Sequence, residues 1–598
     1  MKKDVNVKIP ADFATETKEL ILSASGFRKV FAGNEDSFSP DISETNRIIC
    51  ACIVRGYCEY LHAGEIDKTI LIATDARPTG PSIAKTAMEV FDHYGINTIY
   101  IGIASAPEAM AYAALDRSYE GFCYISASHN PVGHNGFKFG KSEGGVLSAS
   151  EVRIIIDNIQ KSFSDNGRIN EIINVLHQPC EQHPIDIERK NNAVAIYKDF
   201  LLSIAFESHS KILKDFLAEM KRSPAGVIGE LNGSARGLSA DKVFFDSLLI
   251  SNRFFNEVPG KIVHGIVPEG SNLDTCKELL QKINRDNPEY ILGYVPDNDG
   301  DRGNIVFMSR RDNKARILKA QEVFALSVLS ELLYLEYLHL NGYCVIEKPA
   351  VVVNGPTSMR IEYIAEKLGA EVFRAEVGEA NVVELAKMKR SQGYTVRILG
   401  EGSNGGNITH PAAVRDPINT IISFLKLLKL KGSEGSSGLF EIWCGINSIE
   451  YNPDFTLDDI LDTLPQFTTT DAYEPDAKMQ IRSLSHGKLK AEYENLLKKT
   501  SFPSSLYKAF GNITYTVVNY EGVENRIGEG NRTGDEKGGF KILLHSESLR
   551  SDIGYVWMRG SGTEPVFRVL VDLSTRDSSL ERDLLMWHRD MVEKADRT

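Results

Sequence analysis

Short apolar runs alternate with amphipathic helical patterns along most of the chain, and this alternation constrains the fold more than any other feature. In the first third, residues 69–76, 97–102 and 121–127 have the pattern of strands, whereas residues 81–95 and 106–117 have that of helices. Strands that alternate with helices form parallel or mixed sheets covered on both faces. The sequence therefore predicts an α/β fold.

The alternation returns twice further along the chain. From about residue 225 it shows apolar runs at 225–231, 261–266 and 290–297, and after residue 318 it repeats as far as residue 401. A chain of 598 residues is too long for a single hydrophobic core. We therefore predict three mixed-sheet α/β units in series.

The last hundred residues have a different pattern. Their apolar runs, which indicate a small sheet, are at 515–520, 539–545, 555–559 and 566–574. A closing helix carries on one stripe the side chains of Leu580, Leu584, Trp587 and Met591. We predict a small α+β C-terminal domain, with residues 451–500 as an extension and linker and residues 521–539 as a solvated loop.

Acidic residues outnumber basic ones, with 81 Asp plus Glu against 68 Lys plus Arg and a net charge of -13. This balance argues against a broad electrostatic grip on nucleic acid or on an anionic membrane. The N-terminus lacks an apolar signal segment, and no run reaches the roughly 18 apolar residues of a membrane span. We expect a cytoplasmic protein without nucleic-acid or membrane partners, whose 8 scattered cysteines are buried core residues.

Loops that follow strands are where ligands gather in open α/β sheets. The first, SASHNP at 126–131, contains an Asn-Pro pair and is followed by glycines, which together enforce a tight, non-helical course. This course lifts the Ser128 hydroxyl away from the sheet edge, with His129 and Lys138 close in sequence. Ser128 then suits a nucleophile or a phosphoryl carrier, although the spacing also fits a polar turn with a capping serine.

A second loop, VPDNDGDRGN at 295–304, carries Asp297, Asp299 and Asp301 at alternate positions. In an extended chain their carboxylates fall on one side and can converge on a hard cation such as Mg²⁺. An EF-hand is excluded, because its sixth position would be Arg302 instead of Gly. We favour a metal site over a solvated turn, because carboxylates this close repel one another unless a cation offsets them.

A third loop, LGEGSNGGN at 399–407, has the G-x-G-x-x-G spacing of a dinucleotide-binding loop. A dinucleotide fingerprint should open a helix, but Asn407, Thr409 and Pro411 follow at once. We therefore reject a nucleotide-dependent oxidoreductase. The loop is interpreted as a flexible polar segment in which Glu401 and Ser403 suit the hydroxyls of a sugar.

A fourth loop, MRGSGTEPVFR at 558–568, places several polar groups around one turn. They are Arg559, Ser561, Gly562, Thr563 and Arg568. Two arginines, two hydroxyls and the backbone N–H groups of a glycine turn form an anion nest, and the best match for such a nest is phosphate.

In this order the four loops resemble those of the α-D-phosphohexomutase family, which includes phosphoglucomutase and phosphomannomutase. SASHNP resembles the family's phosphoserine loop, and DNDGDR at 297–302 resembles its metal loop. GEGSNGG at 400–406 is similar to the sugar loop, and RGSGTEP at 559–565 to the phosphate loop. SGFRK at 25–29 is similar to the N-terminal segment whose arginine, here Arg28, approaches the phosphoserine.

The resemblance implies four domains around a central cleft, each carrying one of the loops in turn. The expected boundaries are 1–200, 201–310, 311–480 and 481–598. Phospho-Ser128 would donate its phosphoryl group to a sugar phosphate, giving a hexose 1,6-bisphosphate that turns around and returns the other phosphate to the serine. The implied partners are therefore small sugar phosphates, bound by a monomer or dimer.

The resemblance also implies a role for each candidate residue. Mg²⁺ would be held by Ser128, Asp297, Asp299 and Asp301. Arg28 and Lys138 would steady the charge of the transferred group, with Lys138 and His129 as candidate general acids or bases. The sugar hydroxyls would bind to Glu401 and Ser403. The phosphate that does not react would bind to Arg559, Ser561, Gly562, Thr563 and Arg568.

The chain departs from the family pattern in two places. Asn404 and Gly405 follow Ser403 where the family usually has Gly-His, and the third-domain loop at 377–383 offers acidic Glu379 where the family often has a cation. Both departures fall on the parts that choose the sugar, so glucose 1-phosphate is placed only slightly ahead of mannose 1-phosphate. We expect an active phosphohexomutase, and the alternative is a catalytically silent member that binds sugar phosphate as a scaffold or sensor.

Overall fold

The computed structural model describes residues 8–23, 26–62, 69–178, 183–207, 209–404, 406–432, 436–483, 485–532, 538–560 and 566–597. The chain forms two compact units. The first comprises Met1–Leu213, Met220–Val306 and Ala412–Ile418. The second comprises Lys214–Glu219, Phe307–Pro411 and Asn419–Thr598.

A six-stranded mixed sheet begins the first unit, with the strand order β1-β2-β6-β5-β3-β4. Its strands are β1 (Ile21–Ser23), β2 (Gly26–Val30), β3 (Thr69–Thr74), β4 (Asn97–Ile103), β5 (Gly121–Ile125) and β6 (His134–Lys141). β3 is parallel to β4 and β5, whereas β6 is antiparallel to β2 and β5. The predicted strands of the first third are confirmed as β3, β4 and β5.

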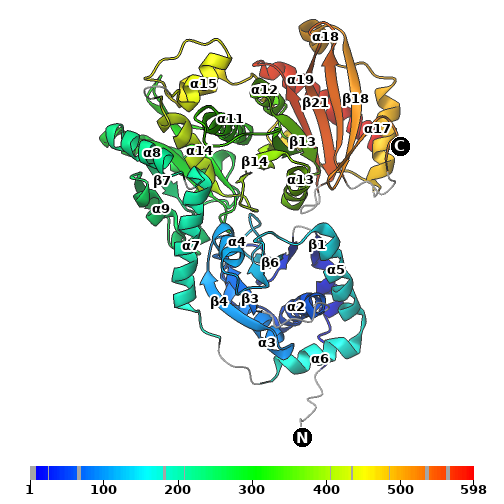
Figure 1. Cartoon of the computed structure of the whole chain (residues 1–598). Coiled ribbons are helices and arrows are strands. Elements are labelled where there is room, and N and C mark those ends of the chain that lie inside the picture. The colour runs from blue at the N-terminus through cyan, green and yellow to red at the C-terminus, as the bar shows by residue number, and fades with distance from the viewer. Residues whose placement is uncertain are drawn as a thin grey trace. The chain divides into compact units, whose positions relative to one another are not determined.

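Helices cover both faces of this sheet (Figure 1). On one face are α1 (Phe13–Glu16), α2 (Glu44–His62), α3 (Gly80–His93), α5 (Ala149–Ser164) and α6 (Asn166–Leu176). On the other are α4 (Ala106–Leu115) and α7 (Ile187–Phe206). Successive residues of a strand point to opposite faces, so Ile70 and Ile72 enter the first core cluster while Leu71 and Ala73 enter the second.

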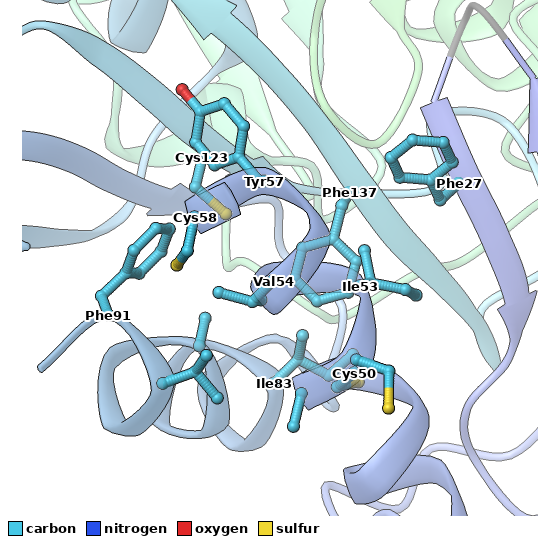
Figure 2. Close-up of a cluster of buried hydrophobic side chains, with 14 of the residues drawn as sticks. Phe27, Cys50, Ile53, Val54, Tyr57, Cys58, Ile83, Phe91, Cys123 and Phe137 are labelled. Carbon is cyan, nitrogen blue, oxygen red and sulfur yellow. The ribbon is translucent and has the colours of Figure 1, made fainter. Parts of the chain in front are cut away.

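Cysteines fill part of the first of these clusters. Figure 2 shows Cys50, Cys58 and Cys123 among the side chains that α2, α3 and the sheet contribute. Cys52, Cys276 and Cys444 are buried as well, and Cys344 is half-buried. The predicted core role is therefore confirmed for the buried cysteines, whereas Cys180 lies outside the described residues.

A second sheet has the order β11-β10-β9-β7-β8. Its elements are β7 (Gly226–Glu230), β8 (Ser251–Phe255), β9 (Tyr290–Pro296), β10 (Gly303–Ser309), β11 (Lys314–Ile317), α9 (Asp241–Ser247) and α10 (Asp274–Asp286). The apolar run at 261–266 forms no strand, contrary to the pattern, and the polar segment β8 takes that place parallel to β7. The backbone N–H groups of Val263 and His264 donate to Asn232 Oδ1 instead of to a neighbouring strand.

The second unit contains a mixed sheet of order β13-β12-β14-β15. Its strands are β12 (Pro349–Asn354), β13 (Glu371–Ala375), β14 (Thr395–Glu401) and β15 (Gly406–Thr409), and its helices are α11 (Ala320–Leu340), α12 (Arg360–Lys367) and α13 (Glu379–Ser391). Among the described residues, α11 alone has the length and apolarity of a membrane span, and 83% of that stretch is buried within the protein. Helices α8 (Ser210–Arg222) and α14 (Pro417–Lys429) contain residues of both units.

The C-terminal sheet is antiparallel, with the order β16-β22-β21-β20-β18-β19 and β17 also paired to β22. Its strands are β16 (Thr468–Thr469), β17 (Lys478–Met479), β18 (Ile513–Glu521), β19 (Glu524–Ile527), β20 (Phe540–Ser546), β21 (Ser551–Gly560) and β22 (Phe567–Leu573). Helices α17 (His486–Leu497) and α19 (Ser578–Asp596) flank it, as Figure 1 shows. The remaining helices of the unit are α15 (Leu439–Ile446), α16 (Leu457–Thr463) and α18 (Ser504–Phe510).

Two sequence predictions for this region need correction. Residues 451–500 are not a linker, because they form α16 and α17 and supply β16 and β17 to the sheet. Part of the predicted solvated loop at 521–539 forms β19. The stripe on α19 is confirmed, with Leu584 and Met591 buried and Leu580 and Trp587 packed against the same cluster.

Three mixed α/β sheets and a C-terminal antiparallel sheet domain confirm the predicted fold class. The central cleft and the proposed domain boundaries stay predictions.

A buried carboxylate ties α11 to β14 and α14 in the second unit. Glu331 forms ion pairs with Lys426 (Nζ–Oε1 2.6 Å) and Arg397 (Nε–Oε2 2.6 Å). Burial alone would raise the pKa of Glu331, but the two cations outweigh it and lower the pKa to about 2. Because this pKa lies below the ordinary value of 4.5, the stability it contributes is complete above about pH 4.5 and is lost as pH falls toward 2.

We expect Glu331→Gln to lower the free energy of unfolding by about 3–5 kcal/mol at pH 7, because it leaves two buried cations without their carboxylate. The difference from the unmodified protein should be smaller at pH 3, where the stabilisation is already partly lost. Urea unfolding at the two pH values measures both effects. Exposed Glu547→Gln is the matched control, and unfolding curves for Glu331→Gln that match this control would contradict the prediction.

Candidate active site

Ser128 lies just beyond the end of β5 in a conformation that few serines adopt. The strand ends at Ile125, and Ser128 has a left-handed backbone with φ of 52°. Such a conformation is strained for a residue with a Cβ atom, so the surroundings must hold it in place. The side chain is nevertheless buried, with Ser128 only 1% exposed.

Arg77 holds the loop in this conformation. Its guanidinium donates to the backbone oxygens of Ser128 (2.7 Å), Asn130 (2.7 Å) and Pro131 (2.5 Å). Its Nε donates to Asp75 Oδ2 at 3.1 Å, and both side chains are buried. Because Asp75 and Arg77 directly follow β3, the neighbour of β5, the sheet itself positions this clamp.

The aspartate loop follows β9 and turns at Gly300, which has φ of 70°. Arg236 holds the turn from behind, donating from Nε (3.0 Å) and Nη2 (2.8 Å) to the Gly300 carbonyl. Arg236 is itself buried and paired with Asp241 (3.1 Å) and Asp416 (2.6 Å). The loop is therefore a rigid turn fixed by a buried ion-pair network.

The structure brings the serine loop and the aspartate loop together inside the first unit. Ser128 Oγ donates to Asp297 Oδ2 at 2.8 Å, and Ser126 Oγ donates to Asp299 Oδ2 at 3.0 Å. Lys138 Nζ lies 2.7 Å from Asp299 Oδ2 and 3.4 Å from Asp301 Oδ2. Residues that are far apart in sequence thus share one hydrogen-bonded cluster, which is what the predicted site requires.

The carboxylates of this cluster differ in charge environment. Burial raises the pKa of Asp297 well above its ordinary value, and Asp299 and Asp301 raise it further. Burial opposes the charge of Asp301 too, but Arg415 and Lys138 outweigh it and hold the pKa of that carboxyl below its usual range. Arg415 donates from Nη2 to Asp301 Oδ2 at 3.0 Å.

The aspartate triad fits a hard divalent cation. One oxygen from each of Asp297, Asp299 and Asp301 can be chosen so that all lie within 4.8 Å of one another. Asp299 Oδ1 and Asp301 Oδ1 are buried and accept no hydrogen bond from the part of the chain that the structure describes. Buried carboxylate oxygens without donors are costly, and oxygen-rich sets of this kind suit Mg²⁺ or Ca²⁺.

Arg28 and His129 are placed at the same cluster. Arg28 lies on β2 opposite Gly136 of β6, where a Cβ would lie 1.8 Å from the Phe27 carbonyl, so only glycine permits this pairing. Burial and the charge of Arg302 lower the pKa of Arg28 to about 10, while Asp299 and Asp301 oppose the shift.

The imidazole of His129 is neutral at physiological pH. Burial holds the pKa of His129 well below its usual range, and Arg302, Arg28 and Arg415 add to the effect. A neutral imidazole can accept a proton but has none to release as a cation. Both roles that the sequence predicts for His129, general acid and general base, stay predictions.

The sugar-loop residues lie in the second unit, where β14 ends. Glu401 Oε1 accepts from Asn354 Nδ2 (3.0 Å) and from the Gly378 backbone N–H (2.8 Å). Ser403 is half-buried, with Oγ 3.5 Å from Asn354 Nδ2. Strand β15 follows the loop instead of a helix, which confirms the rejection of a dinucleotide fingerprint.

Only the arginines of the predicted phosphate loop can be placed, because Ser561, Gly562 and Thr563 lie outside the described residues. Arg559 and Arg568 are cross-strand partners on β21 and β22. Arg559 Nε lies 3.2 Å from Glu376 Oε1, and Arg568 donates to the Ala472 carbonyl. Glu376 and Gly378 together connect Arg559 with Glu401, so the segment after β13 joins the two predicted substrate loops.

Sequence reasoning missed Arg77 and Arg415. Arg77 stands in TDAR at the carboxyl end of a predicted strand, so the rule that found Ser128 applies to it as well. Arg415 precedes α14 and follows no strand directly, and no local signal points to it.

The fold and the site together define a class of multidomain α/β proteins in which a buried serine faces an acidic loop. The sequence matches family models described as "Phosphoglucomutase/phosphomannomutase, alpha/beta/alpha domain I" over residues 25–165 and "alpha/beta/alpha domain III" over residues 331–443. Domains I and III of the chain are thus domains of the α-D-phosphohexomutase family.

Individual relatives are distant. A phosphoglucosamine mutase of Natranaerobius thermophilus is 30% identical over 149 residues, covering 23% of this chain and 33% of that relative. A phosphomannomutase of Methanocaldococcus jannaschii is 23% identical over 319 residues, covering 53% of this chain and 60% of that relative. The match to each of these two relatives thus spans less than two thirds of its length.

The fold is shared with solved structures over nearly the whole chain. A protein described as a "putative phosphomannomutase" from Thermus thermophilus superimposes with a TM-score of 0.60 at 17% identity, covering 96% of this chain and 99% of that one.

Proposed function

We propose that this protein is a phosphohexomutase, an isomerase that interconverts hexose 1-phosphate and hexose 6-phosphate through phospho-Ser128 and a hexose 1,6-bisphosphate. The observation that carries the proposal is the 2.8 Å hydrogen bond from Ser128 Oγ to Asp297 within a buried aspartate triad. This arrangement places a strained serine backbone next to three carboxylates that repel one another, which is costly. A serine with a purely structural role does not require such an arrangement.

Phosphoryl transfer here exchanges one P–O bond for another. The bond between phosphorus and Ser128 Oγ breaks, a bond to the sugar hydroxyl oxygen forms, and the hydroxyl proton passes to a neutral base, for which His129 is the candidate. Catalysis of such a step depends mainly on positioning and on charge stabilisation. Arg77 positions the serine, while Arg28 and Lys138 supply positive charge beside it.

Asp297, Asp299 and Asp301 would hold Mg²⁺, with the phosphoserine as a further ligand. When bound, Mg²⁺ would neutralise negative charge on the phosphoryl oxygens. Lys138 and Arg415 would keep the carboxylates oriented by their ion pairs with Asp299 and Asp301.

Metal dependence gives a prediction with two readouts. We expect dialysis against EDTA to abolish turnover and Mg²⁺ to restore it. Asp299→Asn should weaken Mg²⁺ binding, measured by calorimetry, by about 10–100-fold, whereas exposed Asp157→Asn should leave it unchanged. Full turnover after exhaustive chelation, or equal Mg²⁺ affinity of the two variants, would contradict the assignment.

The substrate is proposed to be a hexose phosphate, with glucose 1-phosphate slightly ahead of mannose 1-phosphate. Glu401 and Ser403 would bind ring hydroxyls, and Arg559 and Arg568 the phosphate that does not react. Two of the relatives described above carry the names phosphoglucosamine mutase and phosphomannomutase, so glucosamine 1-phosphate belongs in the same panel. We also propose a cytoplasmic protein, from the sequence composition, and a monomer or dimer, from the family resemblance.

One observation favours the alternative of a silent sugar-phosphate binder. Arg559 is already paired with Glu376, and Arg568 already donates to a backbone carbonyl, so a substrate phosphate must compete for both arginines. This competition would weaken the grip on the phosphate that does not react.

A substrate panel separates the two functions. One preparation is assayed on glucose, mannose and glucosamine 1-phosphates, each primed with its 1,6-bisphosphate, and binding of each is measured by calorimetry. Turnover of any one of them supports the mutase, and its kcat/KM ranks the sugars. Binding without turnover of any sugar would establish the silent alternative and overturn the mutase.

A further inference from the structure

A cavity of about 230 Å³ lies within the second unit. Five parts of the unit line it, namely the start of α11, the start of α12, the loop after β14, the segment around β16 and the turn after β22. The residues that line it are Lys319, Ala320, Gln321, Glu322, Arg360, Ser403, the segment 466–472, Thr575 and Arg576.

Arg360 is the most buried charged residue that lines this cavity. The residue is only 6% exposed, and among the described residues its guanidinium donates one hydrogen bond, from Nη2 to the Phe467 carbonyl at 2.7 Å. Its Nε is buried without a hydrogen-bond partner. Within the described part of the chain, no carboxylate forms an ion pair with it. A buried guanidinium is normally paired, because removing its charge from water is costly.

The carboxylates near Arg360 are used elsewhere. Asp572 accepts from the Met359 backbone N–H at 2.7 Å and from the Thr469 hydroxyl. Glu322 accepts from the Lys319 backbone N–H at 3.1 Å, where it caps α11. Burial lowers the pKa of Arg360, although Glu322 and Asp572 both oppose the shift. The cavity therefore contains a cation whose charge is only partly offset.

The rest of the lining is polar and largely fixed. Gln321 donates to the Pro356 carbonyl (3.1 Å) and accepts from the Ser358 backbone N–H (2.9 Å), so its amide is held rigidly. The Thr468 hydroxyl donates to the Thr575 carbonyl at 2.8 Å. Lys319 and Arg576 are exposed at the rim. Cationic lining residues outnumber acidic ones, which are Glu322 and Asp471.

We propose that this cavity binds a small oxyanion, the phosphate or carboxylate group of a short metabolite, on the guanidinium of Arg360. Arginine is the side chain best suited to hold such a group, because its N–H donors match the spacing of two oxygens. The volume lies below the roughly 300–1,000 Å³ of sites for drug-sized ligands, which favours a compact ligand.

Occupancy of this cavity would act on the sugar loop. Ser403 lines the cavity, and the neighbouring Gly402 N–H donates to Thr357 Oγ1 at 3.0 Å, in the loop that leads to Arg360. An anion that orders Arg360 would thus order the loop that carries Ser403. We therefore expect a bound anion to change the KM for sugar phosphate more than kcat. This kinetic effect rests on the proposed function, whereas binding of the anion to Arg360 does not.

Crystals of the full chain soaked in selenate provide a direct test, because anomalous scattering locates selenium. We expect a selenate at the Arg360 guanidinium in the unmodified protein and none there in Arg360→Gln. Selenate bound elsewhere with none at Arg360 would overturn the proposal. The experiment on the unmodified protein decides the question even if the variant fails to fold.

Calorimetry with inorganic phosphate, sulfate and citrate distinguishes the chemical sources of the oxyanion. It uses Ser128→Ala protein as background, so that turnover and loss of the proposed function do not affect the result. We expect Arg360→Gln to lower the affinity for the tightest-binding of the three ligands at least about tenfold. Arg576→Gln at the rim should lower the same affinity by no more than about threefold. Equal affinity of Arg360→Gln and its background for all three would contradict the proposal.

Discussion

Ser128→Ala is expected to lower the turnover of hexose phosphate by at least about 10³-fold, because it removes the oxygen that would carry the phosphoryl group. The fold should survive, since the hydroxyl makes one hydrogen bond, to Asp297, and its loss costs about 1 kcal/mol. Coupled assays of 1-phosphate to 6-phosphate conversion measure the first effect, and urea unfolding measures the second.

The matched control is Ser162→Ala, which makes the same chemical change at another buried serine of the first unit. Its hydroxyl donates to the Asn158 carbonyl of its own helix at 3.1 Å and accepts from Arg168 Nε and Nη2, each at 3.4 Å. The control should retain full turnover. If Ser128→Ala retained it as well, the phosphoryl group would have to travel by another route, and the assignment of Ser128 would be wrong.

Arg77→Met is expected to have the largest combined effect on stability and activity. It leaves Asp75 buried without its cation and three carbonyl oxygens of the serine loop without their donor. We expect the free energy of unfolding to fall by about 3–5 kcal/mol. Turnover should fall by about 10²-fold or more, because Ser128 loses the support for its left-handed backbone.

Arg77→Lys and Arg117→Met provide the comparisons. Lysine keeps the charge but cannot reach several carbonyls as a planar fork does, so its effect should be intermediate. Arg117 is exposed, and its replacement should change neither quantity. An Arg77→Met protein with the stability and kinetics of the Arg117 control would show that the clamp is unnecessary.

Much of the fold can be predicted from the sequence, because hydrophobic periodicity reports burial directly. The runs at 69–76 and 121–127 alternate between two apolar faces, which is why they form central strands of the first sheet. The prediction of a strand at 261–266 was wrong, because a strand must pair its backbone groups with a neighbouring strand. In this run the backbone N–H groups of Val263 and His264 donate to the Asn232 side chain instead. Apolar character alone does not reveal which segment pairs with β7.

The candidate site could be predicted where its residues are clustered in sequence. Ser128 and the aspartate triad each stand in a loop directly after a strand, and the structure joins them as expected. Arg415 and Arg236 could not be predicted, since each reaches the aspartate loop through tertiary packing. The pairing of Arg559 with Glu376 could not be predicted either. The sequence of a predicted anion-binding loop does not show which of its arginines already pair with a carboxylate.

Transfer of label to Ser128 tests the central claim most directly. Dephosphorylated protein is incubated with glucose 1,6-bisphosphate that carries ³²P. The protein is then digested, and the labelled peptide is identified by mass spectrometry. We predict that the label sits on Ser128 and leaves it when unlabelled glucose 1-phosphate is added. Sustained conversion of glucose 1-phosphate to glucose 6-phosphate by protein whose Ser128 never acquires label would contradict the account.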